Sequence, residues 1–237
     1  MPSRRRPCWP NSAPAKRAEP RKQHRRPRQP RRLRLPTLPW EGPWKAARFR
    51  GRLIVLSGPS GVGKSTIAEA ILRRRPDLET VTSRTTRPPR PGDGVGKAYE
   101  HVSPDEFERL RASGELLESA VVHGERYGTP REPVERLLGE GRDVLLEIDL
   151  QGARQVKARR RDAVTIFLEP PSWEALENRL RARRTEDDER LRRRLETAKE
   201  ELAAAGEFDH RVVNDQLERA VDQVNRILKQ GPQGEKR

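Results

Sequence analysis

The sequence predicts an α/β fold, in which helices cover a central, mostly parallel β-sheet. One observation is local: an apolar run at 53–56 leads into a glycine-rich loop and then into apolar residues at helical spacing. The other concerns the whole chain, because strand-like apolar runs alternate with helical segments from Gly51 onward, as they do around parallel sheets. The 237 residues suffice for one such domain with additions, or for two small ones.

The loop at 58–66 is a phosphate-binding motif. It reads GPSGVGKST and fits the pattern G-x-x-x-x-G-K-[ST], with a strand before it and a helix after it as the motif requires. Glycines permit the unusual dihedral angles with which backbone N–H groups turn inward around an anion, and the helix adds its positive end. We expect Lys64 to reach the β- and γ-phosphates of a nucleotide and the Ser65 hydroxyl to bind Mg²⁺.

The other elements are expected in chain order. The first strand, loop and helix occupy about 52–75, and an extended, turn-rich stretch follows at 78–102. A helix begins after Ser103, which suits a capping position before Pro104. We expect strands at 116–122, 144–149, 163–168 and 208–213, and helices at 130–138, at 169–204 with a break near 183–185, and at 217–228.

Of the net charge of +15, +14 belongs to the first 50 residues. They hold 16 Lys and Arg against 2 Asp and Glu, whereas the other 187 residues hold 35 against 34. Like charges repel and proline lacks a backbone donor, so we expect residues 1–50 to be disordered. We interpret them as a dispensable extension or an early start of translation. The alternatives are a nucleic-acid-binding arm, an organelle transit peptide and a tether to anionic membranes.

Composition also bears on location. Cys8 is the only cysteine, so no disulfide can form within the chain, which fits a reducing compartment. No run approaches the ~18 apolar residues of a membrane span, and the N-terminus lacks the apolar centre of a secretory signal. We therefore expect a soluble, cytoplasmic protein that does not bind membranes. The histidines at 101, 123 and 210 show no metal-ligand spacing.

A second anion-binding pattern follows the loop. Arg87 and Arg90 lie three positions apart in a proline-stiffened segment, and arginine binds phosphate oxygens in a bidentate manner. Farther along, the carboxylate of Glu118 can accept two N–H bonds in one plane, which is the geometry that guanine N1–H and the 2-amino group offer and adenine does not. The rings of Tyr99 and Tyr127 can stack on a base or donate to a phosphate.

Together these motifs resemble guanylate kinase. GPSGVGKST, TSRTTRPPRPGD, the tyrosine in GKAYEHV, LLESAVVHGERYGTP and LLEIDLQGA occur in the family's order, and the resemblance covers about residues 51–230. It implies a P-loop NTPase three-layer fold with an inserted GMP-binding α+β domain and a helical lid. It also implies transfer of the γ-phosphoryl group of ATP to GMP, and to dGMP, in purine metabolism with Mg²⁺ as cofactor.

The resemblance carries roles over to individual residues. ATP is expected to bind the loop at Gly58, Pro59, Ser60, Gly61, Val62, Gly63, Lys64, Ser65 and Thr66, together with Arg179 and Asn214. GMP is expected to bind Ser83, Arg87, Arg90, Tyr99, Glu118, Tyr127, Thr129 and Asp149. The catalytic cations are then Lys64, Arg87, Arg183 and Arg194. Ser65 is expected to bind the Mg²⁺, with Asp149 assisting through a water molecule.

The resemblance also divides the chain. It implies a core at 51–82, 140–180 and 195–230, a GMP-binding insert at 83–135, a lid at about 180–194 and a flexible tail at 231–237. Three residues depart from the family pattern. Thr129 is serine in some members, Glu147 stands where many members have aspartate, and Arg184 replaces a glycine, which makes the lid tip stiffer and more basic.

Other functions account for fewer of these residues. A GTPase is suggested by the D-x-x-G pattern at 149–152, but no Asn-Lys-x-Asp follows to read a guanine in the donor site. A non-catalytic guanylate-kinase-like binding module tends to lose parts of the loop, and here Lys64 and Ser65 are intact. A P-loop NTPase without an acceptor would leave the arginine, tyrosine and glutamate set unused. Nucleic-acid binding by the basic tail could coexist with the enzyme.

Overall fold

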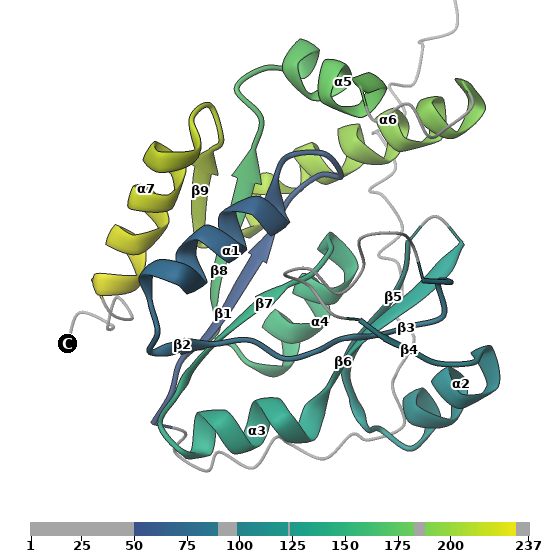
Figure 1. Cartoon of the computed structure of the whole chain (residues 1–237), viewed down its shortest axis with the longest axis vertical. Helices are drawn as coiled ribbons and strands as arrows, with labels where there is room; N and C mark the ends of the chain where they lie inside the picture. The colour runs from purple at the N-terminus through teal and green to yellow at the C-terminus, as the bar shows by residue number, and fades with distance from the viewer. Residues whose placement is uncertain (1–49, 90–98, 123, 183–187, 231–237) are drawn as a thin grey trace, which may run out of the picture. The chain divides into compact units, whose positions relative to one another are not determined.

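The structure, a computed structural model, describes residues 50–89, 99–122, 124–182 and 188–230 (Figure 1). Its main sheet has five strands, all parallel, in the order β2-β7-β1-β8-β9. The strands are β1 (Leu53–Ser57), β2 (Leu78–Glu79), β7 (Asp143–Glu147), β8 (Val164–Glu169) and β9 (His210–Val213). Because all five run the same way, their carboxyl ends meet at one edge, where ligands bind in sheets of this kind.

Helices cover both faces of the main sheet, and the side chains of β1 show why. Ile54 and Leu56 point into one apolar cluster with α1 and α7, whereas Leu53 and Val55 point into another with α3 and α4. Every residue of β1 is buried, as a central parallel strand requires. The covering helices are α1 (Lys64–Arg74), α3 (Arg131–Gly139), α4 (Leu150–Arg159) and α7 (Leu217–Lys229). The result is three layers: helix, sheet and helix.

A second, smaller sheet has the order β4-β3-β6-β5 and is antiparallel except for the β3–β4 pair. Its strands are β3 (Arg84–Thr85), β4 (Glu100–His101), β5 (Leu116–Val122) and β6 (Glu125–Pro130). Helix α2 (Pro104–Ala112) packs Phe107 on this sheet, and the Ser103 hydroxyl caps it by accepting the Glu106 N–H. In the β5–β6 ladder Glu118 lies directly opposite Thr129. The register of the two strands therefore brings these side chains together.

Two charged helices, α5 (Trp173–Ala182) and α6 (Asp188–Ala203), follow β8. They pack on one another through a small apolar cluster that includes Leu176, Leu180 and Ala198. A short 3₁₀ turn, η1 (Ala205–Glu207), then leads into β9. The expected break near 183–185, with Arg184, lies outside the described residues.

The predicted α/β fold with its parallel sheet is confirmed, and the expected strands and helices occur within a few residues of their predicted bounds. Several elements were not predicted. The short strands β2, β3 and β4 lie in the stretch expected to be extended and turn-rich, strand β6 has a polar sequence, and α4 begins directly after the acidic end of β7. Within the described ranges, every helix is too short or too polar to span a lipid bilayer.

Candidate active site

The phosphate-binding loop connects the carboxyl end of β1 to α1. Gly58, Gly61 and Gly63 adopt positive φ angles of 144°, 84° and 100°, which side chains disfavour. A Cβ at Gly63 would lie 2.6 Å from Nδ2 of Asn214, and one at Gly58 would lie 2.5 Å from the carbonyl oxygen of Leu168. Both the backbone angles and the close neighbours therefore require glycine.

Arg179 and Asn214, both expected to contact ATP, brace this loop. Nδ2 of Asn214 donates to the carbonyl oxygen of Val62 at 2.7 Å. The Arg179 guanidinium donates to the same oxygen at 3.3 Å and to the carbonyl oxygen of Asn214 at 3.1 Å. These bonds fix the loop backbone from outside, so its shape depends on α5 and on the end of β9.

Two polar side chains begin α1 and point into the site. Nζ of Lys64 donates to the carbonyl oxygens of Gly58 at 2.6 Å and Pro59 at 3.1 Å. The Ser65 hydroxyl donates to Oε1 of Glu147 at 2.8 Å. Glu147 is the last residue of β7, so its carboxylate lies at the carboxyl edge of the sheet beside the loop.

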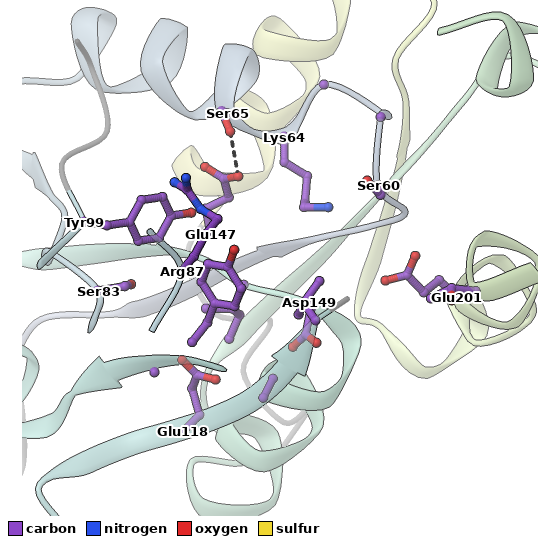
Figure 2. A pocket seen from close by; sticks show the side chains of 18 of the residues that line it. Ser60, Lys64, Ser65, Ser83, Arg87, Tyr99, Glu118, Glu147, Asp149 and Glu201 are labelled. Atoms are coloured by element: carbon purple, nitrogen blue, oxygen red, sulfur yellow. Dashed lines mark hydrogen bonds between the residues drawn. The ribbon is translucent and has the colours of Figure 1, made fainter. Parts of the chain in front are cut away.

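A cavity of about 330 Å³ separates the loop from the second sheet (Figure 2). On the loop side it is lined by Ser60, Gly61, Gly63, Lys64, Ser65 and Thr66. On the other side, the residues expected to bind GMP that line it are Ser83, Arg87, Tyr99, Glu118, Tyr127 and Asp149. The two sets of residues, distant in the sequence, therefore face one space.

The remaining expected site residues have other positions. Thr129 donates to Glu118 and lines a second cavity of about 240 Å³. Gly58, Pro59 and Val62 contribute backbone to the loop, and Arg194 is half-buried on α6. Arg90 and Arg183 lie outside the described residues.

Glu118 is the most deeply buried of the described carboxylates that line the cavity, with 3 % of its surface exposed. It accepts a hydrogen bond of 2.6 Å from the Thr129 hydroxyl. Burial raises the pKa of Glu118 to about 7; the Thr129 bond opposes this shift and the charge of Asp149 adds to it. Asp149 caps α4 by accepting the Gly152 N–H at 2.8 Å, and burial also raises the pKa of Asp149.

Arg87 is a buried cation beside two tyrosines. With 7 % of its surface exposed, it places its guanidinium carbon 5.6 Å from the centre of the Tyr99 ring. The Tyr99 and Tyr127 rings meet edge to face with centres 5.7 Å apart. Nη1 of Arg87 donates to the carbonyl oxygen of Pro88 at 3.0 Å, and Nδ1 of His101 donates to that of Arg87 at 2.6 Å. The positive charge is thus held at the cavity wall.

Two cavity carboxylates were not among the expected site residues. Glu147 was noted only as a departure from the family pattern, although its position at a strand end beside the loop was a usable signal. Glu201 was not predicted, because α6 contains many charged residues. Its position seven residues after Arg194, and therefore on the same helix face, was a usable signal.

The oxygen ligands at the loop fit a magnesium ion. The hydroxyl of Ser65 and the carboxylates of Glu147 and Asp149 are hard donors of the kind that Mg²⁺ prefers. In the part of the chain that the structure describes, no three or more His, Cys, Asp or Glu side chains group closely enough to hold a metal themselves. A Mg²⁺ ion here would take its other ligands from water and nucleotide phosphates.

A sequence model of guanylate kinase matches residues 50–231, which is most of the chain. This chain belongs to the guanylate kinase family. The guanylate kinase of Thermobifida fusca is 56 % identical over 177 residues, which cover 75 % of this chain and 90 % of that protein. The guanylate kinase of a Nostoc species is 51 % identical over 178 residues, covering 75 % and 89 %.

A solved structure gives the same result for the fold. The crystal structure of guanylate kinase from Anaplasma phagocytophilum has a TM-score of 0.65 and 34 % identity, covering 78 % of this chain and 88 % of that one. These matches confirm the family that the motifs indicated.

Proposed function

We propose that the cavity is a two-substrate active site in which ATP transfers its γ-phosphoryl group to GMP, giving ADP and GDP. Phosphorylation of GMP by ATP is the reaction of the guanylate kinase family, to which the chain belongs. The observation that carries the assignment to this cavity is the position of Glu118. A buried, hydrogen-bonded carboxylate faces the phosphate-binding loop across a space of about 330 Å³.

The residues on the second-sheet side of the cavity recognise the guanine of GMP, the phosphate acceptor. Ionised Glu118 accepts the N1–H and the 2-amino group of the base, and Thr129 orients the carboxylate. Adenine presents no such donor pair, so its binding would leave a buried carboxylate unpaired, which is strongly unfavourable. Arg87 neutralises the GMP phosphate, and Tyr99 holds the guanidinium in place.

The residues on the loop side of the cavity bind the phosphates of ATP, the phosphoryl donor. The N–H groups of the loop and the start of α1 surround the β-phosphate, and Lys64 leaves the loop carbonyls to reach the β- and γ-phosphates. When bound at Ser65 and Glu147, Mg²⁺ supplies charge neutralisation for the γ-phosphoryl group. Arg183 and Arg194 add positive charge from the lid side.

The transfer needs no strong general base. The attacking GMP phosphate oxygen is already ionised at pH 7, so no proton must be removed. A bond forms between that oxygen and the γ-phosphorus, the bond to the β–γ bridging oxygen breaks, and ADP leaves with the bonding pair. Catalysis therefore consists of positioning, charge neutralisation and exclusion of water. We assign the exclusion of water to the lid at about 180–194.

Several narrower assignments belong to this proposal. The core, the insert at 83–135 and the lid act as separate functional parts of the chain. The enzyme also accepts dGMP, because none of the contacts assigned above involves the ribose 2′-hydroxyl. The reaction takes place in the cytoplasm, and residues 1–50 are dispensable for it. Nucleic-acid binding by that basic stretch would be an additional property of the chain, separate from catalysis.

The decisive experiment measures ADP formation from ATP with GMP, dGMP, AMP, CMP or UMP as acceptor. It compares the full chain with a form that starts at Gly51. We expect turnover with GMP and dGMP only, at equal rates for both forms. Lys64→Ala should reduce turnover at least about a thousandfold, whereas Lys229→Ala, at an exposed lysine on α7, should not change it. ADP release at the same rate without any acceptor would instead identify an NTPase.

A further inference from the structure

Glu201 is a cavity carboxylate to which the proposed reaction gives no role. It lies near the end of α6 and lines the same space as Ser60 and Lys64. Its Oε2 is buried and has no hydrogen-bond partner among the described residues. Figure 2 shows the carboxylate pointing away from its helix toward the loop that carries Ser60.

Burial makes this carboxylate unfavourable for folding. Desolvation raises the pKa of Glu201 to about 7, and the charges of Asp149 and Glu200 act in the same direction, whereas the charge of Lys64 and the Ser60 N–H oppose the shift. A buried carboxylate oxygen without a partner lowers stability, so a neutral side chain would serve the fold better. A perturbed group of this kind in a cleft indicates a functional role.

The face of α6 that carries Glu201 suggests what that role is. Arg194, Thr197 and Glu201 are spaced by three and four positions, so they share one side of the helix. Thr197 and Glu201 both line the cavity. The backbone N–H of Ser60 faces Glu201 and favours its charged form. The helix face that also carries Arg194 therefore meets the loop at Glu201.

We propose that Glu201 is a positioning residue for the ATP half of the site. Its carboxylate receives the Ser60 N–H, docks α6 on the phosphate-binding loop and fixes Arg194 above the ATP phosphates. This inference rests on the proposed function, because it assumes that ATP occupies the loop. We expect its effect to be selective for ATP, because the residues assigned to GMP come from elements other than α6.

The test compares Glu201→Ala and Glu201→Gln with Glu196→Ala, a change at an exposed carboxylate on the same helix. ATP and GMP are titrated separately by calorimetry, and KM is measured for each substrate. We expect the Kd and KM of ATP to rise about tenfold in Glu201→Ala. The rise should be smaller in Glu201→Gln, whose amide oxygen can still accept the Ser60 N–H. The Kd of GMP should change less than about twofold, and Glu196→Ala should match the wild type.

Stability separates this role from a structural one. Glu201→Gln should have a Tm equal to or above that of the wild type, because it removes a buried charge. Equal losses for ATP and GMP, a lower Tm in Glu201→Gln, or tighter ATP binding in Glu201→Ala would each overturn the proposal. If the wild type failed to phosphorylate GMP, the proposed function would fail, yet the ATP titrations without acceptor would still decide the role of Glu201.

Discussion

The hydroxyl of Thr129 donates a hydrogen bond of 2.6 Å to Oε1 of Glu118, and both residues are buried opposite one another on β5 and β6. This bond fixes the orientation of the carboxylate. A preoriented acceptor loses little conformational freedom when a base binds. The recognition of guanine by Glu118 therefore depends on the register in which β5 and β6 pair.

Replacing the carboxylate tests this recognition. In Glu118→Gln the amide retains one acceptor oxygen and presents an N–H₂ group to the donors of guanine, so one buried pairing is lost. We expect kcat/KM for GMP to fall about a hundredfold with unchanged ATP affinity. Glu115→Gln, at an exposed carboxylate just before the same strand, is the matched control. Unchanged GMP kinetics in Glu118→Gln would contradict the assignment.

The raised pKa of Glu118 predicts a pH dependence. Only the ionised carboxylate accepts two N–H bonds, so KM for GMP should fall as the pH rises from about 6 to 8 through the pKa of about 7. In Glu118→Gln, whose side chain does not titrate, only the slope due to ionisation of the GMP phosphate should remain. Ionisation of the GMP phosphate affects both proteins alike, so the ratio of their KM values isolates Glu118.

The same group links stability to pH with a definite sign. Its pKa is about 7 in the folded chain against 4.5 in the reference state, so the folded state binds more protons between these values. This contribution to stability is complete below pH 4.5 and is lost as the pH rises through 7. The free energy of unfolding of the wild type relative to Glu118→Gln should therefore fall by on the order of 3 kcal/mol over that range. Urea unfolding at both ends of the range measures it.

The sequence predicted the parts of the site that are contiguous. The glycine loop has one local pattern, and its flanking strand and helix follow from the apolar spacing at 53–56 and 67–72. Glu118 and Thr129 were found only through their place in a wider set of motifs. The two residues are opposite each other on neighbouring strands, and no local sequence pattern predicts this contact. Strand β6 is too polar to be predicted as a strand, and it is formed by pairing with β5.

The carboxylates of Glu147 and Glu201 could not be placed from the sequence for a related reason. The bond between Ser65 and Glu147 joins positions 82 residues apart, and it exists because β7 and β1 are neighbours in the sheet. The orientation of Glu201 depends on how α6 packs on α5 through Ala198. In a helix crowded with Arg and Glu, only tertiary packing distinguishes Glu201, which faces the cavity, from the other described carboxylates.

Gly152 is predicted to be a steric determinant of GMP binding. A Cβ at this position would lie 2.5 Å from Oε2 and 3.0 Å from Cδ of Glu118, and that carboxylate is held by Thr129 and cannot move freely. Gly152→Ala should raise KM for GMP at least about tenfold while ATP affinity is retained. Gly139→Ala on α3 has open space around its new methyl group and should leave both unchanged. A GMP affinity equal to the wild type in Gly152→Ala would show that the carboxylate can shift.

The hydrogen bond between Ser65 and Glu147 predicts how the enzyme uses magnesium. Both oxygens are positioned to orient the ion or the water molecules around it, so removing either should weaken the productive Mg²⁺–ATP complex. In Glu147→Gln and in Ser65→Ala the free Mg²⁺ concentration for half-maximal rate at fixed ATP should rise about tenfold. Because the two side chains act together, the double variant should lose much less than the product of the single effects. Glu132→Gln, at an exposed carboxylate on α3, serves as the control. An unchanged Mg²⁺ titration in both single variants would show that Ser65 and Glu147 do not contribute to the metal site and that the nucleotide alone binds the ion.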